Sequence, residues 1–115
     1  MKEKNFYVGF YNEIVKAKIE KFVSQNHLKQ AFDEVTDELK RNPTNGQQVP
    51  KNKGKKFYKK FGIDNLWRID VIRSHPGFRL WYTIVTKENT IEIRIMSVLL
   101  SMESHKEYER SLKNK

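Results

Sequence analysis

Two arginines, a histidine and a tyrosine are the side chains of this sequence whose types and spacing best suit chemistry on a phosphate. Arg68 and Arg79 each occur in a segment of alternating apolar and polar residues, so each is expected on the polar face of a strand. His105 and Tyr108 are three positions apart and would share one face of a helix. Guanidinium groups bind phosphate oxygens, and a histidine can serve as acid or base near neutral pH.

The same residues also have an interpretation that involves no function. His105 and Tyr108 can be an exposed histidine and a tyrosine packed on the sheet. Oppositely charged residues on neighbouring antiparallel strands often form a simple ladder of charges. The residues spaced for such a ladder are Asp70, Arg79, Glu92 and Arg94.

A lysine-rich segment precedes the predicted strands. Residues 51–60 include six lysines and no acidic residue, interrupted and followed by Phe57, Tyr58 and Phe61. Rings can stack on bases while ammonium groups meet phosphates, so this pattern favours nucleic acid, although the rings can equally pack the segment onto the core. The predicted nucleic-acid contacts are Lys55, Lys56, Lys59 and Lys60, together with Arg73 beside a turn and Trp81 as an exposed stacking ring.

Composition narrows the class of protein. The chain has 115 residues, a length typical of one domain, and a net charge of +9, which favours an anionic partner. It has no cysteine and only three scattered histidines, so no metal site and no cofactor is expected. Without a signal-like start or an apolar run long enough for a membrane span, the expected location is the cytoplasm, with no membrane partner.

The periodicity of apolar residues predicts an α+β domain spanning residues 1–115. Residues 1–11 are a lead-in or an edge strand, 12–41 an α-hairpin, 43–62 a basic loop, 65–100 an antiparallel meander of three strands, and 103–112 a short C-terminal helix. The α-hairpin is expected to cover the apolar face of the sheet and to leave the other face open. With a turn at 74–77, Asp70 is expected nearly opposite Trp81, and Arg68 nearly opposite Thr83.

From about Phe32 to the C-terminus, this order of elements resembles the RelE/ParE superfamily of toxins from type II toxin–antitoxin systems. The strongest signal is the strand Gly77-Phe78-Arg79-Leu80-Trp81-Tyr82, which is similar to that family's glycine–aromatic–Arg–Leu–x–Tyr strand. The resemblance implies a small sheet with an α-hairpin on one face and an open cationic groove on the other. It also implies an acidic antitoxin that covers the groove.

RelE-like members cleave mRNA on the ribosome by attack of a ribose 2′-OH, without a metal. By position, the resemblance implies that Arg79 corresponds to the family's phosphate-stabilising arginine. It also implies that Arg68 occupies the position of a catalytic lysine of the family, and that Tyr108 aligns with a functional C-terminal tyrosine. His105 is the type of residue that serves as acid or base in some branches. Asp70 departs from the family, which has a lysine there. This departure favours an alternative, a non-catalytic binding module of the same fold. A ParE-like inhibitor of DNA gyrase is a further alternative.

Overall fold

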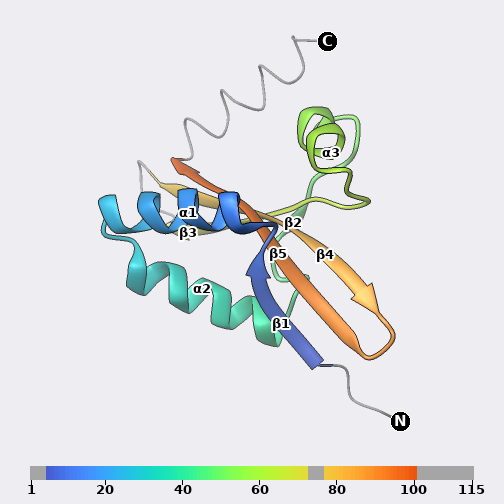
Figure 1. The fold of residues 1–115 in the computed structure, drawn as a ribbon, viewed down its shortest axis with the longest axis horizontal. Coiled ribbons are helices and arrows are strands. Elements are labelled where there is room, and N and C mark those ends of the chain that lie inside the picture. The colour runs from blue at the N-terminus through green and yellow to red at the C-terminus, as the bar shows by residue number, and fades with distance from the viewer. Residues whose placement is uncertain (1–4, 73–76, 101–115) are drawn as a thin grey trace.

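The computed structural model describes residues 5–72 and 77–100. These residues form five strands and three helices, which follow one another along the chain (Figure 1). The elements are β1 (Asn5–Phe10), α1 (Glu13–Gln25), α2 (Lys29–Arg41), β2 (Gln47–Gln48), α3 (Lys55–Phe61), β3 (Trp67–Ile72), β4 (Phe78–Lys87) and β5 (Thr90–Leu100). The α+β class and the α-hairpin are as predicted. The helix predicted at 103–112 lies outside the described residues.

All five strands form one sheet in the order β1-β5-β4-β3-β2. Strands β3, β4 and β5 are an antiparallel meander, as predicted. The N-terminal segment, for which a lead-in and an edge strand were both compatible with the sequence, is the edge strand β1, and it pairs with β5 in parallel. The sheet is therefore mixed, and the prediction of a purely antiparallel sheet is wrong. The α-hairpin between β1 and the meander allows the parallel pairing, since parallel neighbours need a long connection.

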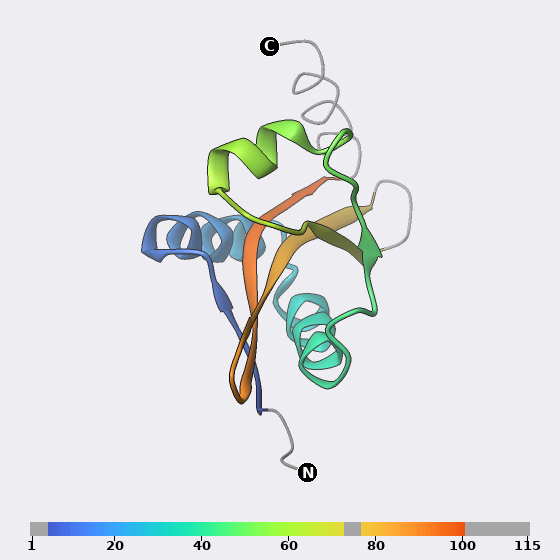
Figure 2. The same cartoon turned by 90° about the vertical axis from the view of Figure 1, so that its right-hand side faces the viewer.

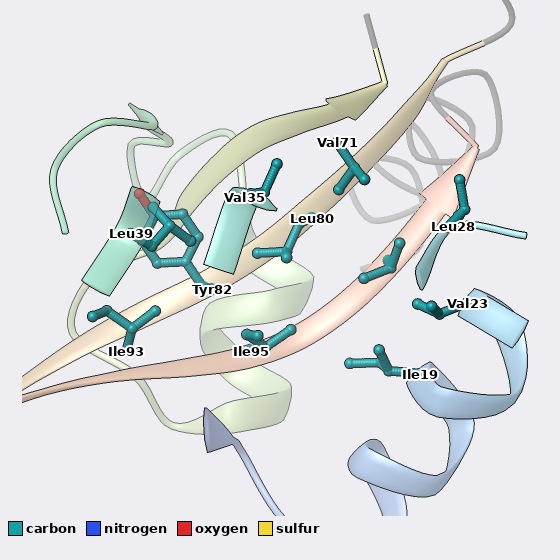
Figure 3. Close-up of a cluster of buried hydrophobic side chains, with 11 residues drawn as sticks. Ile19, Val23, Leu28, Val35, Leu39, Val71, Leu80, Tyr82, Ile93 and Ile95 are labelled. Atoms are coloured by element: carbon teal, nitrogen blue, oxygen red, sulfur yellow. The ribbon is translucent and has the colours of Figure 1, made fainter. Parts of the chain in front are cut away.

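The α-hairpin covers one face of the sheet and closes the main hydrophobic core. Its buried residues from α1 and α2 meet every second residue of β4 and β5, among them Leu80, Tyr82, Ile93 and Ile95 (Figure 3). Helix α1 begins at the N-cap Asn12, whose side chain accepts a hydrogen bond from the Val15 N–H at 2.8 Å. The alternation that predicted this apolar face of β4 is confirmed.

The opposite face is not open, because helix α3 covers its centre. Figure 2 shows α2 and α3 on opposite sides of β3 and β4. Phe57 of α3 packs on Trp81 of β4, and both belong to a second buried cluster with Val49, Leu66 and Met96. The segment 43–62, predicted as a basic loop, thus contains β2 and α3. The phenyl rings among its lysines pack it onto the sheet, which was the alternative interpretation of this segment.

Two irregularities adjust the strands to these two clusters. The pairing of β4 with β5 shifts between Trp81 and Tyr82, where Met96 is the extra residue on β5. Ile95 therefore packs in the main core, Met96 under α3, and Val98 in the main core again. The second shift lies between Asp70 and Ile72 of β3. In the part of the chain that the structure describes, no helix is long and apolar enough to cross a membrane.

Candidate nucleic-acid interface

Arg68 and Arg79 lie on the face of the sheet that carries α3. Arg68 is paired with Trp81, and Asp70 is paired with Arg79. Side chains of directly paired residues point to the same face, and diagonal neighbours have Cβ atoms about 7 Å apart. The two arginines are diagonal neighbours, so their guanidinium groups reach one common region. The predicted register, with Asp70 opposite Trp81 and Arg68 opposite Thr83, is wrong by two residues. Asp70 pairs with Arg79 and Arg68 with Trp81, so the pairing is centred between positions 74 and 75 rather than between 75 and 76.

Arg79 forms an ion pair with Asp70 across the two strands. Its Nε donates to Asp70 Oδ1 at 3.3 Å, and the two side chains are 29% and 41% exposed. An ion pair that is this accessible adds little to stability and is readily exchanged for another anion. The pair agrees with the charge-ladder interpretation. It also shows that Asp70 occupies a position from which it competes with a phosphate for Arg79.

Arg68 is held by the short strand β2. Its Nε and one terminal nitrogen donate to Gln47 Oε1 at 3.3 and 3.0 Å, and Gln47 is also its backbone partner. The Gln47 amide is neutral, in contrast to the carboxylate at Arg79. This contact therefore orients the Arg68 guanidinium through a neutral group.

Strand β2 is fixed beside Arg68 by the buried Tyr82. The Tyr82 hydroxyl donates to the Pro43 carbonyl oxygen at 2.8 Å and accepts from the Gly46 N–H at 3.2 Å. Burial raises the pKa of Tyr82 to about 12, so the phenol stays neutral at any ordinary pH. Only glycine fits at position 46, because a Cβ there would lie 2.5 Å from that hydroxyl and 2.6 Å from the Arg68 carbonyl oxygen.

The prediction that Trp81 is an exposed stacking ring is wrong. Trp81 is 1% exposed and stacks on Phe57 with ring centroids 5.0 Å apart and an interplanar angle of 12°. Alternation placed Trp81 correctly on the face opposite the main core, but that position lies under α3. A large ring of this kind is more stable under an apolar helix face than in water.

The predicted lysine contacts are spread around α3. Lys55, Lys59 and Lys60 are exposed, as are Lys51 and Lys53 in the turn before the helix. Lys55 and Lys59 line a hollow beside Tyr58, whereas Lys60 lies over the Phe61 ring and lines a separate groove next to α1. The side chain of Lys56 is outside the described part of the structure. The lysines of α3 therefore lie on two different sides of the helix, with Lys55 and Lys59 at one hollow and Lys60 at another groove.

Three of the predicted residues, Arg73, His105 and Tyr108, lie outside the described residues, so the structure brings together only Arg68 and Arg79 of the catalytic set. Sequence reasoning missed Gln47, Gly46 and Tyr82, which position Arg68. The sequence has a turn pattern in this region, Thr44-Asn45-Gly46. The long-range contact from the Tyr82 hydroxyl to Pro43 has no local signature in the sequence.

Comparison with known proteins adds no further constraint. No family model, no curated protein and no solved structure matches this chain. What can be inferred about function therefore depends on the charges and contacts described above.

Proposed function

We propose that this protein is a RelE-like toxin, a ribosome-dependent endoribonuclease that cleaves mRNA. The observation that carries the proposal is the placement of Arg68 and Arg79 as diagonal neighbours on one face of adjacent strands. Two guanidinium groups at this spacing suit the oxygens of one phosphate, whose charge rises as the phosphorus becomes five-coordinate. The lysines of α3 add a positive field that attracts RNA backbone.

The reaction is an internal transesterification. The ribose 2′-oxygen bonds to the adjacent phosphorus, and the bond from that phosphorus to the 5′-oxygen breaks. The 2′-OH proton passes to a base, the 5′-oxygen receives a proton from an acid, and the products carry a 2′,3′-cyclic phosphate and a 5′-OH. In this scheme, Arg68 and Arg79 stabilise the phosphorane, His105 is the acid or base, and Tyr108 assists or orients it.

Chain connectivity is compatible with these roles. Strand β5 ends at Leu100, and Leu99 is the backbone partner of Arg79. His105 follows Leu100 by five residues, a span of at most about 18 Å in an extended chain. A connection of this length permits the role proposed for His105.

The topology supports the family resemblance in part. An α-hairpin on one face of a small sheet and arginines on the other are what the resemblance implies. Helix α3 departs from the expected open groove, since it fills the centre of that face. On this face, RNA would then contact the region around Arg68, Asp70 and Arg79. An acidic antitoxin that competes for these arginines is the proposed protein partner.

The Asp70–Arg79 ion pair favours a second candidate function. If Asp70 keeps Arg79 from the phosphate, the protein is a binding module that retains contacts with RNA or an antitoxin and does not cleave. The two candidates therefore differ in whether the RNA strand is broken.

Cleavage can be tested with purified protein and ribosomes paused on a defined mRNA. We expect new 5′ ends within the reading frame, abolished in Arg79→Ala and strongly reduced in Arg68→Ala. Arg94→Ala is a matched control, because Arg94 is also a strand arginine and donates to a carboxylate, Glu92, at 2.8 Å. Intact mRNA with the wild-type protein still bound to the ribosome would instead support the binding module.

A further inference from the structure

A hollow on the outer side of α3 combines an apolar floor with a cationic rim. It has a volume of about 540 Å³ and is lined by Lys51, Asn52, Lys55, Tyr58, Lys59 and Ile63. Tyr58 and Ile63 are half-buried, whereas the three lysines are exposed. Lys55 and Lys59 are four residues apart in α3, so they stand side by side along one edge of the hollow.

The floor of the hollow is held in place before any ligand binds. The Tyr58 hydroxyl donates to the Val49 carbonyl oxygen at 2.6 Å, which fixes the direction of the ring. Gly54 lies so close to Leu66 and to the Tyr58 ring that a Cβ would be 2.8 and 3.4 Å from them. Burial raises the pKa of the Tyr58 phenol above its ordinary value, so the ring carries no negative charge that would repel an anion.

The rim is available to bind an anion. Within residues 5–72 and 77–100, none of Lys51, Lys55 and Lys59 forms an ion pair. The Lys51 ammonium lies 6.0 Å from the centroid of the Tyr58 ring, the distance of a cation–π contact. A ligand with a flat ring and a nearby negative charge would replace the Lys51 ammonium on the face of the Tyr58 ring. The ammonium would then pair with the negative charge of the ligand.

We propose that this hollow is a second nucleic-acid site, which holds one base of single-stranded RNA on Tyr58 and the flanking phosphates on Lys51, Lys55 and Lys59. Stacking on an aromatic ring combined with ammonium–phosphate contacts is how proteins bind single strands without reading sequence. An acidic peptide would use the lysines but not the ring. This second site rests on the proposed function in one respect, that RNA is the partner, and it requires no cleavage.

The binding test uses the full chain and a fluorescent single-stranded octaribonucleotide, measured by anisotropy over a range of salt concentrations. In Lys55→Gln with Lys59→Gln, the slope of log Kd against log salt should fall by about 1.4, because each ammonium–phosphate pair on a single strand contributes about 0.7 to it. The matched control is Lys21→Gln with Lys40→Gln, which removes two exposed helix lysines from outside the hollow. Equal slopes for the two double variants would overturn the proposal.

Stacking is tested separately with 2-aminopurine in the octaribonucleotide. Tyr58→Leu should abolish the quenching of 2-aminopurine fluorescence and weaken RNA binding about fivefold or more. Tyr58→Phe keeps the aromatic ring, so it should retain the quenching and the RNA affinity of the wild type. Circular dichroism of each variant shows whether it is folded. If Tyr58→Leu does not fold, the salt dependence of the lysine double variant decides whether the hollow binds RNA. Competition by octaglutamate as strong as by unlabelled RNA would mark an acidic-peptide site and contradict the proposal. Loss of cleavage in Arg79→Ala with this binding intact separates the two sites.

Discussion

Asp70 and Arg79 lie directly opposite each other on β3 and β4, and the Arg79 Nε donates to Asp70 Oδ1 at 3.3 Å. The carboxylate thus stands where a phosphate would bind, next to Arg68. RNA that uses Arg79 must displace Asp70, unless Asp70 itself takes the proton of the 2′-OH. The role of this pair decides between a cleaving enzyme and a binding module.

Asp70→Asn removes one negative charge and preserves the shape of the side chain. If Asp70 only competes with phosphate, the variant should bind RNA more tightly and cleave faster. Its free energy of unfolding should change by less than about 1 kcal/mol, because the ion pair is exposed. Anisotropy and urea titration measure these effects, with Glu92→Gln as a control of equal charge change. Tighter binding together with loss of the cleavage that the wild type performs would identify Asp70 as the base.

Phe57→Ala should release α3 from the sheet, because the buried Phe57 ring of α3 stacks on Trp81 of β4. We expect a loss of about 3–5 kcal/mol in the free energy of unfolding, the usual cost of removing a buried phenyl ring. In a Trp67→Phe background, the emission of Trp81 should shift to the red. Ile14→Ala, at a residue that is 69% exposed, should stay within about 0.5 kcal/mol. An unshifted emission would mean that Trp81 is covered by something other than α3.

Gly46→Ala should loosen β2 and weaken its hold on Arg68, since a Cβ at this position meets the Tyr82 hydroxyl and the Arg68 carbonyl oxygen. Overpacking of this kind costs about 1–3 kcal/mol. Gly9→Ala is the matched control, because a Cβ there meets nothing within 4 Å. Thermal melts of the two variants provide the comparison, and equal melting temperatures would contradict the close packing at Gly46.

The raised pKa of Tyr82 predicts how the free energy of unfolding depends on pH in the alkaline range. Its pKa is about 12 in the folded protein and near the ordinary value of 10 when unfolded, so the unfolded chain loses this proton first. The contribution of Tyr82 is fully present below pH 10 and is lost as the pH rises towards 12. Tyr82→Phe should be less stable at pH 7, by about 1–3 kcal/mol for the unpaired Gly46 N–H and Pro43 oxygen. Its urea midpoint should then fall less between pH 10 and 12 than that of the wild type.

Periodicity was sufficient for the features that depend on one face of one element. The periodicity of apolar residues predicted the α-hairpin at 12–41, whose second arm buries Val35 and Leu39. The alternation around Leu80 and Tyr82 predicted the core face of β4. In each of these cases, the pattern reflects burial against a single partner surface, which is a local property of the sequence.

Features that depend on two surfaces at once were not predictable from the pattern. Trp81 alternates out of the main core, yet it is buried, because Phe57, far earlier in the chain, belongs to a helix that folds above it. Asp70 pairs with Arg79, and the register shifts between Asp70 and Ile72. Neither alternation nor composition specifies these long-range relations, and they determine which charges surround the arginines.

The most direct test of cleavage is to map mRNA 5′ ends in cells during induced expression of this chain, beside Arg79→Ala and Arg94→Ala. We predict new ends within translated reading frames for the wild type and Arg94→Ala, and none for Arg79→Ala. Unchanged mRNA in all three cultures, with the proteins present and folded, would contradict a ribosome-dependent ribonuclease.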